Sequence, residues 1–123
     1  MEIHGRKIHF RRTVLANCEI AEACPDGDIN RFNELLQGSY SVAQKAAALF
    51  MSVLSKGYEM EQKFNDPAYI ERPLTEAECL LLDNDDFNNL FAEAMSVFTD
   101  DGKVTVETEE PKAKGKNATG GGE

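Results

Sequence analysis

The acidic run Asp83 to Asp86 is the first candidate for a chemical role in this 123-residue chain. Closely spaced carboxylates bind hard cations, but an EF-hand calcium loop needs an oxygen ligand at its fifth position and a glycine at its sixth. In a loop that began at Asp83, Phe87 and Asn88 would occupy those positions. Because Asp and Asn are good helix caps, the run is predicted to end one helix and cap the next.

The histidines and cysteines form no recognised catalytic motif. Cys18 and Cys24 are too far apart for the short cysteine hook of a structural zinc site, which holds about two to four intervening residues. Three cysteines are an odd number, which argues against a disulfide framework and favours a reducing compartment, so each is expected to be a small buried apolar residue. No serine lies in a glycine elbow and no cysteine adjoins a histidine. We therefore expect no enzymatic activity, metal or cofactor.

The charge distribution is more informative. The chain has 13 Lys and Arg against 22 Asp and Glu, a net charge of −9, and the segment from Glu59 to Glu110 alone carries −12. Such a field disfavours nucleic acid as a partner, and it either speeds encounter with a basic protein or only keeps the surface soluble. No apolar run is long enough to span a membrane and the start is polar, so we expect a cytoplasmic protein without membrane contact.

Hydrophobic spacing predicts one mainly α domain with a short N-terminal β-hairpin around Gly5, flanked by basic residues that keep the strand edges soluble. About five helices are expected. The first covers 13–24 and is capped by Thr13, the second runs from Asp26 or Asp28 to Gly38, and the third covers 42–57, capped by Ser41 and stopped by Gly57. The fourth covers 76–82 behind a Thr75–Glu78 capping box, and the fifth covers 87–101. A short helical turn over 58–64 and a loop over 65–73 separate the third and fourth. Residues 104–107 can add an edge strand. The predicted domain covers 1–108, and 109–123 form a disordered lysine- and glycine-rich tail.

The last predicted helix carries an apolar stripe that is the candidate partner-binding site. Its residues are Phe87, Leu90, Phe91, Met95 and Phe98. Core packing is the plainer interpretation, because an amphipathic helix must bury its apolar face. Alternatively, the stripe lines a groove for an amphipathic helix of another chain.

Several short motifs, spread over nearly the whole chain, suggest a family. They are the segment 24–29 before a helix, an alanine-rich helix ending at 57–59, the segment 72–75, the segment 85–87, and the segment 103–107 before a lysine-rich end. In this arrangement the chain resembles the tail assembly chaperones encoded by phages and prophages of Gram-positive bacteria. The resemblance implies a non-virion protein of the host bacterial cytoplasm. Such a protein binds the long, hydrophobic, helical tape measure protein and keeps it soluble while tail tube subunits polymerise around it.

The resemblance has further implications and one competitor. The major tail tube protein is a second candidate partner, and several copies of the chain, as a homo-oligomer, could coat a long client. Members often have a longer product made by ribosomal frameshifting, and residues 115–117 could be encoded by a slippery GGA AAA AAC run. The competing hypothesis is an acidic phage inhibitor or nucleic-acid mimic that binds a basic host protein. Steep salt dependence would distinguish such a mimic from apolar capture.

Overall fold

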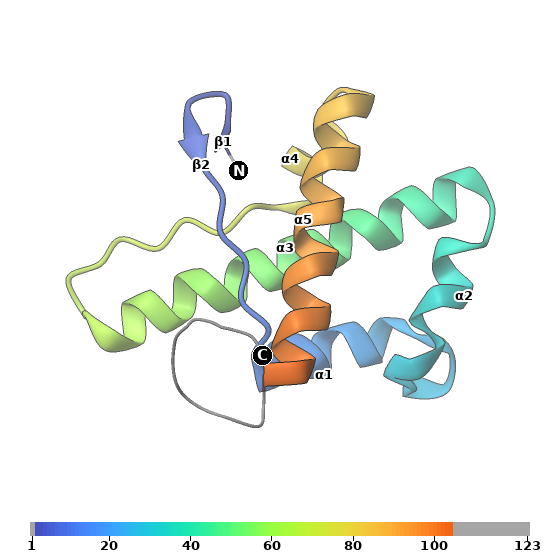
Figure 1. The fold of residues 1–123 in the computed structure, drawn as a ribbon, viewed down its shortest axis with the longest axis horizontal. Helices are drawn as coiled ribbons and strands as arrows, with labels where there is room; N and C mark the ends of the chain where they lie inside the picture. The colour runs from blue at the N-terminus through green and yellow to red at the C-terminus, as the bar shows by residue number, and fades with distance from the viewer. Residues whose placement is uncertain (1, 105–123) are drawn as a thin grey trace.

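The computed structural model describes residues 2–104, which form five α-helices and a two-stranded hairpin (Figure 1). The elements are β1 (Glu2–Ile3), β2 (Arg6–Lys7), α1 (Val14–Ala23), α2 (Phe32–Leu36), α3 (Tyr40–Asn65), α4 (Glu76–Leu80) and α5 (Asn84–Val104), with short 3-10 turns at Pro25–Gly27 and Ile29–Arg31. The mainly α fold class with an N-terminal hairpin is confirmed. The predicted tail and most of the predicted edge strand lie outside the described residues, and Val104 itself belongs to α5.

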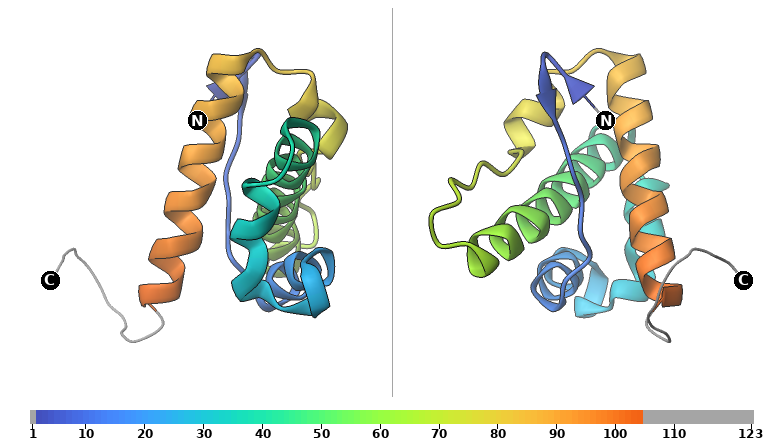
Figure 2. Two further views of the ribbon diagram at one scale, coloured as in Figure 1. Left: turned by 90° about the vertical axis from the view of Figure 1, so that its right-hand side faces the viewer. Right: turned by 60° about the vertical axis from the view of Figure 1, so that its left-hand side comes forward.

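Helix α3 is the central element, and α1, α2, α4 and α5 all contact it. In Figure 1, α3 runs across the molecule, α5 crosses it steeply, and the chain after α3 returns beside the same helix. The segment after the hairpin passes between α3 and α5 (Figure 2): the Arg11 backbone N–H donates to the Leu54 carbonyl at 3.0 Å, and the Arg12 guanidinium donates to the Phe98 carbonyl at 2.9 Å. The N-terminal segment is therefore packed between these two helices, with Ile8 and Phe10 buried and His9 and Arg11 exposed.

The core is built on the buried face of α3. Phe50 is fully buried, and its ring lies 5.1 Å from that of Phe32, 5.7 Å from that of Phe91 and 5.1 Å from that of Phe98. Stacked and edge-to-face aromatic pairs at such distances add stability beyond the area that they bury. Three consecutive alanines, 46–48, are also buried, which lets neighbouring elements approach α3 closely.

Local sequence signals explain the hairpin and two helix starts. The hairpin turn places His4 at φ 52° and Gly5 at φ 79°, and Ile3 pairs with Arg6, as in a two-residue type I′ turn. Thr13 caps α1 by accepting a hydrogen bond from the Ala16 N–H at 3.0 Å. These two predictions are confirmed.

The capping box at the start of α4 is also confirmed. The Glu78 N–H donates to Thr75 Oγ1 at 3.1 Å, and the Thr75 N–H donates to Glu78 Oε1 at 2.9 Å. The bond from the Thr75 backbone is the main reason why the pKa of Glu78 lies below its usual value.

The predicted stop at Gly57 is wrong, because α3 continues through the residues expected to form a separate turn and ends at Asn65. A Cβ atom on Gly57 would lie 2.6 Å from the Arg11 carbonyl oxygen. Glycine is therefore present so that the N-terminal segment can approach, and not because the helix ends.

Three predicted boundaries also differ. Ser39, and not Ser41, caps α3 by accepting from the Val42 N–H at 3.4 Å. The predicted second helix is divided into the two 3-10 turns and α2, because Asp26 adopts φ 58° and Asp28 caps the second turn. Helix α5 begins at Asn84 rather than at Phe87, with the Asp83 side chain accepting from the Asp86 N–H at 2.8 Å.

Candidate functional site

The predicted partner-binding stripe on α5 is part of the core. Leu90 has no exposed surface and Phe87 is only 8% exposed, so neither can contact a partner in this conformation. Phe91, Met95 and Phe98 are partly buried and pack against the same core. The structure therefore favours core packing for this stripe, the plainer of the two interpretations.

The Arg12 guanidinium covers part of this stripe at Phe98. The Arg12 guanidinium carbon lies 3.8 Å from the centroid of the Phe98 ring, and Arg12 Nε donates to the Asn17 side chain at 2.8 Å. A guanidinium over an aromatic face contributes about 0.5–2 kcal/mol, depending on how far it is desolvated. Arg12 thus holds α1, the N-terminal segment and α5 together.

Arg6 and Arg11 also have specific partners, which sequence reasoning missed when it assigned the N-terminal basic residues to solubilising strand edges. Arg11 Nε lies 3.2 Å from a Glu61 carboxylate oxygen on α3. Arg6 donates to the Arg72 carbonyl and lies 3.6 Å from the Glu78 carboxylate. Most of the basic charge near the N-terminus is therefore used to attach this segment to the helices.

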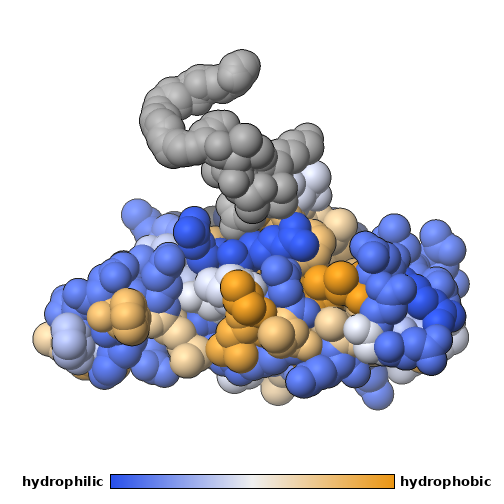
Figure 3. All heavy atoms as spheres, turned by 90° about the horizontal axis from the view of Figure 1, so that it is seen from below, coloured by the Kyte–Doolittle hydropathy of each residue, from blue (hydrophilic) through white to orange (hydrophobic). Residues whose placement is uncertain are grey.

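Large apolar side chains are exposed elsewhere, and we name two groups of them; the others are Tyr40, Val42, Ile70, Leu80 and Leu81. The α1 patch consists of Val14 and Leu15, which are 78% and 43% exposed. The α3-end patch consists of Met60 and Phe64, one helical turn apart, which are 42% and 85% exposed. Figure 3 shows one face on which hydrophobic surface lies in the middle, over α1, again to the right of the middle, and at the left end, where α3 ends; mostly hydrophilic residues lie between the middle and the left end. This face could contact an apolar partner at two points.

The sequence contained a signal for both patches. Val14 and Leu15 are followed by the buried Ala16 and Ile20, so α1 is apolar on more than one side and cannot bury every apolar residue. Met60 and Phe64 continue helical spacing beyond Gly57, but this was hidden by the wrong helix end.

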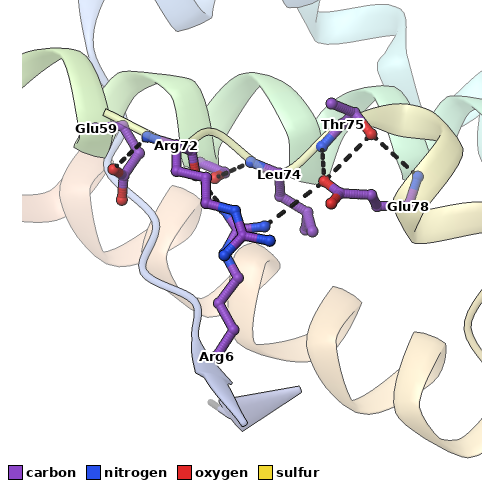
Figure 4. A network of polar contacts seen from close by, with 7 residues as sticks. Arg6, Glu59, Arg72, Leu74, Thr75 and Glu78 are labelled. Carbon is purple, nitrogen blue, oxygen red and sulfur yellow. Dashed lines mark hydrogen bonds and ion pairs between the residues drawn. The ribbon is translucent and has the colours of Figure 1, made fainter. Parts of the chain in front are cut away.

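The return segment after α3 is fixed by two buried polar side chains of that helix. Ser55 Oγ accepts a hydrogen bond from the Leu74 N–H at 2.8 Å. Glu59 Oε1 accepts from the Tyr69 hydroxyl at 2.8 Å and from the Arg72 N–H at 3.0 Å. Figure 4 shows the bonds from the Arg72 and Leu74 N–H groups beside the capping box of α4. The bond to Glu59 is also the main reason why the pKa of Tyr69 is raised.

A pocket of about 390 Å³ lies between the hairpin, this return segment and α4, and we call it the hairpin pocket. The lining combines apolar residues with two arginines, one histidine and one glutamate: Ile3, His4, Gly5, Arg6, Ile8, Arg72, Leu74, Glu78, Leu81 and Leu82. Sequence reasoning missed it because its walls come from three separate segments.

Other kinds of site receive no support from residues 2–104. No three His, Cys, Asp or Glu side chains in this part of the chain are grouped as a metal site would require. Of the helices described here, none has both the length and the apolar character needed to cross a bilayer. Cys24 and Cys79 are buried, whereas Cys18 is exposed, so the prediction that all three cysteines are buried is wrong for Cys18.

Together these features describe a small helical protein with an N-terminal segment packed between two helices, exposed apolar patches and a mixed pocket. Comparison of the chain with protein-family models, curated proteins and solved structures found no match.

Proposed function

We propose that the protein is a tail assembly chaperone of a phage or prophage of Gram-positive bacteria. It acts in the host cytoplasm, where it binds the tape measure protein and keeps it soluble during tail tube assembly, without entering the mature virion. Its action is non-covalent. The motif resemblance described above supports the family, and the exposed apolar patches support the mode of action.

The single observation that carries the proposal is the exposure of paired large apolar side chains in the α1 patch and in the α3-end patch. Exposed apolar residues of this size indicate a contact surface when they recur along a face. A long, apolar, helical client lying along this face could contact both patches, and the hydrophilic residues between them would remain hydrated. Phe and Met are also enriched in protein interfaces.

The first experiment is co-expression with a tape measure protein, the proposed client. Wild-type protein should increase the soluble fraction of the client and copurify with it. An insoluble client and the absence of a complex would refute the proposal.

Variants then assign the contact surface. The double variants Val14→Glu with Leu15→Glu and Met60→Glu with Phe64→Glu change exposed residues, so both should keep helical circular dichroism and lose client binding. A matched control, Asn88→Glu with Asn89→Glu, adds the same charge at exposed positions of α5 and should retain binding. If both patch variants bind the client as wild type does, the proposed surface is wrong.

Salt dependence separates this function from the acidic inhibitor or nucleic-acid mimic. Apolar capture should persist between about 50 and 200 mM salt, whereas a mimic that replaces several phosphates should lose affinity by orders of magnitude. Measuring client capture across that range distinguishes the two.

A further inference from the structure

We propose that the hairpin pocket binds a carboxylate carried on a short aliphatic chain. This inference goes beyond the proposed chaperone function and concerns different residues from the two patches. The site could be occupied whether or not the protein binds a tape measure protein.

The floor of the hairpin pocket is apolar and ordered by the fold. Ile3, Ile8 and Leu74 are 7%, 2% and 4% exposed, and all three line the pocket. The volume of about 390 Å³ falls at the lower end of the range for small-ligand sites, about 300–1,000 Å³. An aliphatic chain of a few carbons would fit against this floor and remove apolar surface from water.

The polar rim of the pocket carries an excess of positive charge. Figure 4 shows the guanidinium groups of Arg6 and Arg72 reaching the same region beside the Glu78 carboxylate. Arg6 is held there by Glu78 and by the Arg72 carbonyl, and its side chain is 19% exposed. Two guanidiniums and one carboxylate, that of Glu78, line the pocket, in a protein whose net charge is −9.

Arg72 has capacity for another anion. Its backbone N–H is used by Glu59, but its guanidinium makes no ion pair with a carboxylate of residues 2–104. The planar fork of a guanidinium matches the two oxygens of a carboxylate. One additional monoanion would neutralise the rim, and its aliphatic chain would lie on the floor.

The direct test is a titration of the full chain with octanoate, in which the NMR chemical shifts of the backbone amides report binding. Octanoate should shift the amide resonances of residues 3–8 and 74–82. Octan-1-ol, which lacks the charge, and acetate, which lacks the chain, should each bind with an affinity at least about 10-fold lower. Equal binding of octan-1-ol, or shifts elsewhere in the protein, would overturn the proposal.

Matched variants test the role of the guanidinium. Arg72→Gln keeps the backbone bond to Glu59 and should weaken octanoate binding about 10-fold or more. Lys45→Gln makes the same charge change at an exposed position outside the pocket and should leave binding unchanged. Equal affinity for octanoate in wild type and Arg72→Gln would refute the assignment.

A final arm identifies the source of the carboxylate. The peptide acetyl-Ala-Leu-Leu is compared in its free-acid and amide forms. Tighter binding of the free acid than of octanoate, again dependent on Arg72, would identify a peptide C-terminus as the preferred source; the reverse order would identify a free aliphatic acid. Absence of binding by both octanoate and the free-acid peptide would overturn the proposal but leave the chaperone function untouched.

Discussion

Replacing Gly57 with alanine gives the sharpest test of the fold, because two physical effects predict opposite signs. In an ordinary helix interior, Gly→Ala stabilises by about 1 kcal/mol. At Gly57, however, the new Cβ would lie 2.6 Å from the Arg11 carbonyl oxygen and 3.2 Å from Thr13 Oγ1. Backbone would have to move to relieve the first contact.

The expected cost can be worked from these contacts. Forcing one extra carbon into a close-packed site costs about 1–3 kcal/mol. Moving Arg11 would also weaken the hydrogen bond from its N–H to the Leu54 carbonyl, which contributes about 1 kcal/mol. This loss offsets the gain in helix propensity, so Gly57→Ala should destabilise the protein by about 1–3 kcal/mol.

Urea unfolding followed by circular dichroism at 222 nm measures this change. The pair Lys45→Ala and Lys45→Gly, at an exposed position of the same helix, supplies the propensity term for α3 and should differ by about 1 kcal/mol. A Gly57→Ala protein that is more stable than wild type by a similar amount would show that the N-terminal segment does not approach α3 as described.

Three further predictions concern buried groups. In native protein at pH 8, only Cys18 should react rapidly with a thiol reagent, because burial raises the pKa of Cys79 to about 12 and also raises that of Cys24. Urea should expose all three thiols. Rapid labelling of Cys79 in the native protein would contradict its burial. Glu59→Ala should lower the free energy of unfolding by about 1.5–3 kcal/mol and speed amide exchange in residues 66–75, whereas Glu59→Gln keeps an acceptor and should cost less. Phe91→Asp should abolish helical circular dichroism because it places a charge against the core, and a folded variant would show that this side chain is replaceable.

Features controlled by short-range chemistry could be predicted from the sequence. The Thr75–Glu78 box and the Thr13 cap each satisfy backbone donors within three residues, so their spacing alone identifies them. The hairpin depends on two residues that accept positive φ, and Gly5 marked it. The mainly α class could be predicted because hydrophobic periodicity is also a signal within short stretches of sequence.

Features controlled by distant segments could not be predicted. Gly57 has the same local signature whether it ends a helix or admits another chain segment, and only the approach of Arg11 distinguishes the two. The stripe containing Phe91 was recognised, but which apolar surface a helix buries depends on all its neighbours. The hairpin pocket joins residues far apart in the sequence, such as Arg6 and Arg72, which are 66 positions apart, and single-helix patterns contain no information about such pairs.

The placement of the N-terminal segment between α3 and α5 affects the order in which a growing chain can complete its structure. Arg12 bonds to a carbonyl 86 residues further along, and ribosomes add about 5–20 residues per second, so this contact must wait about 4–17 s after Arg12 is made. During that interval Ile8 and Phe10 have no α5 to cover them. Residues 8–12 therefore reach their final positions only after α5 has been made, and until then the apolar side chains of this segment lack part of their cover.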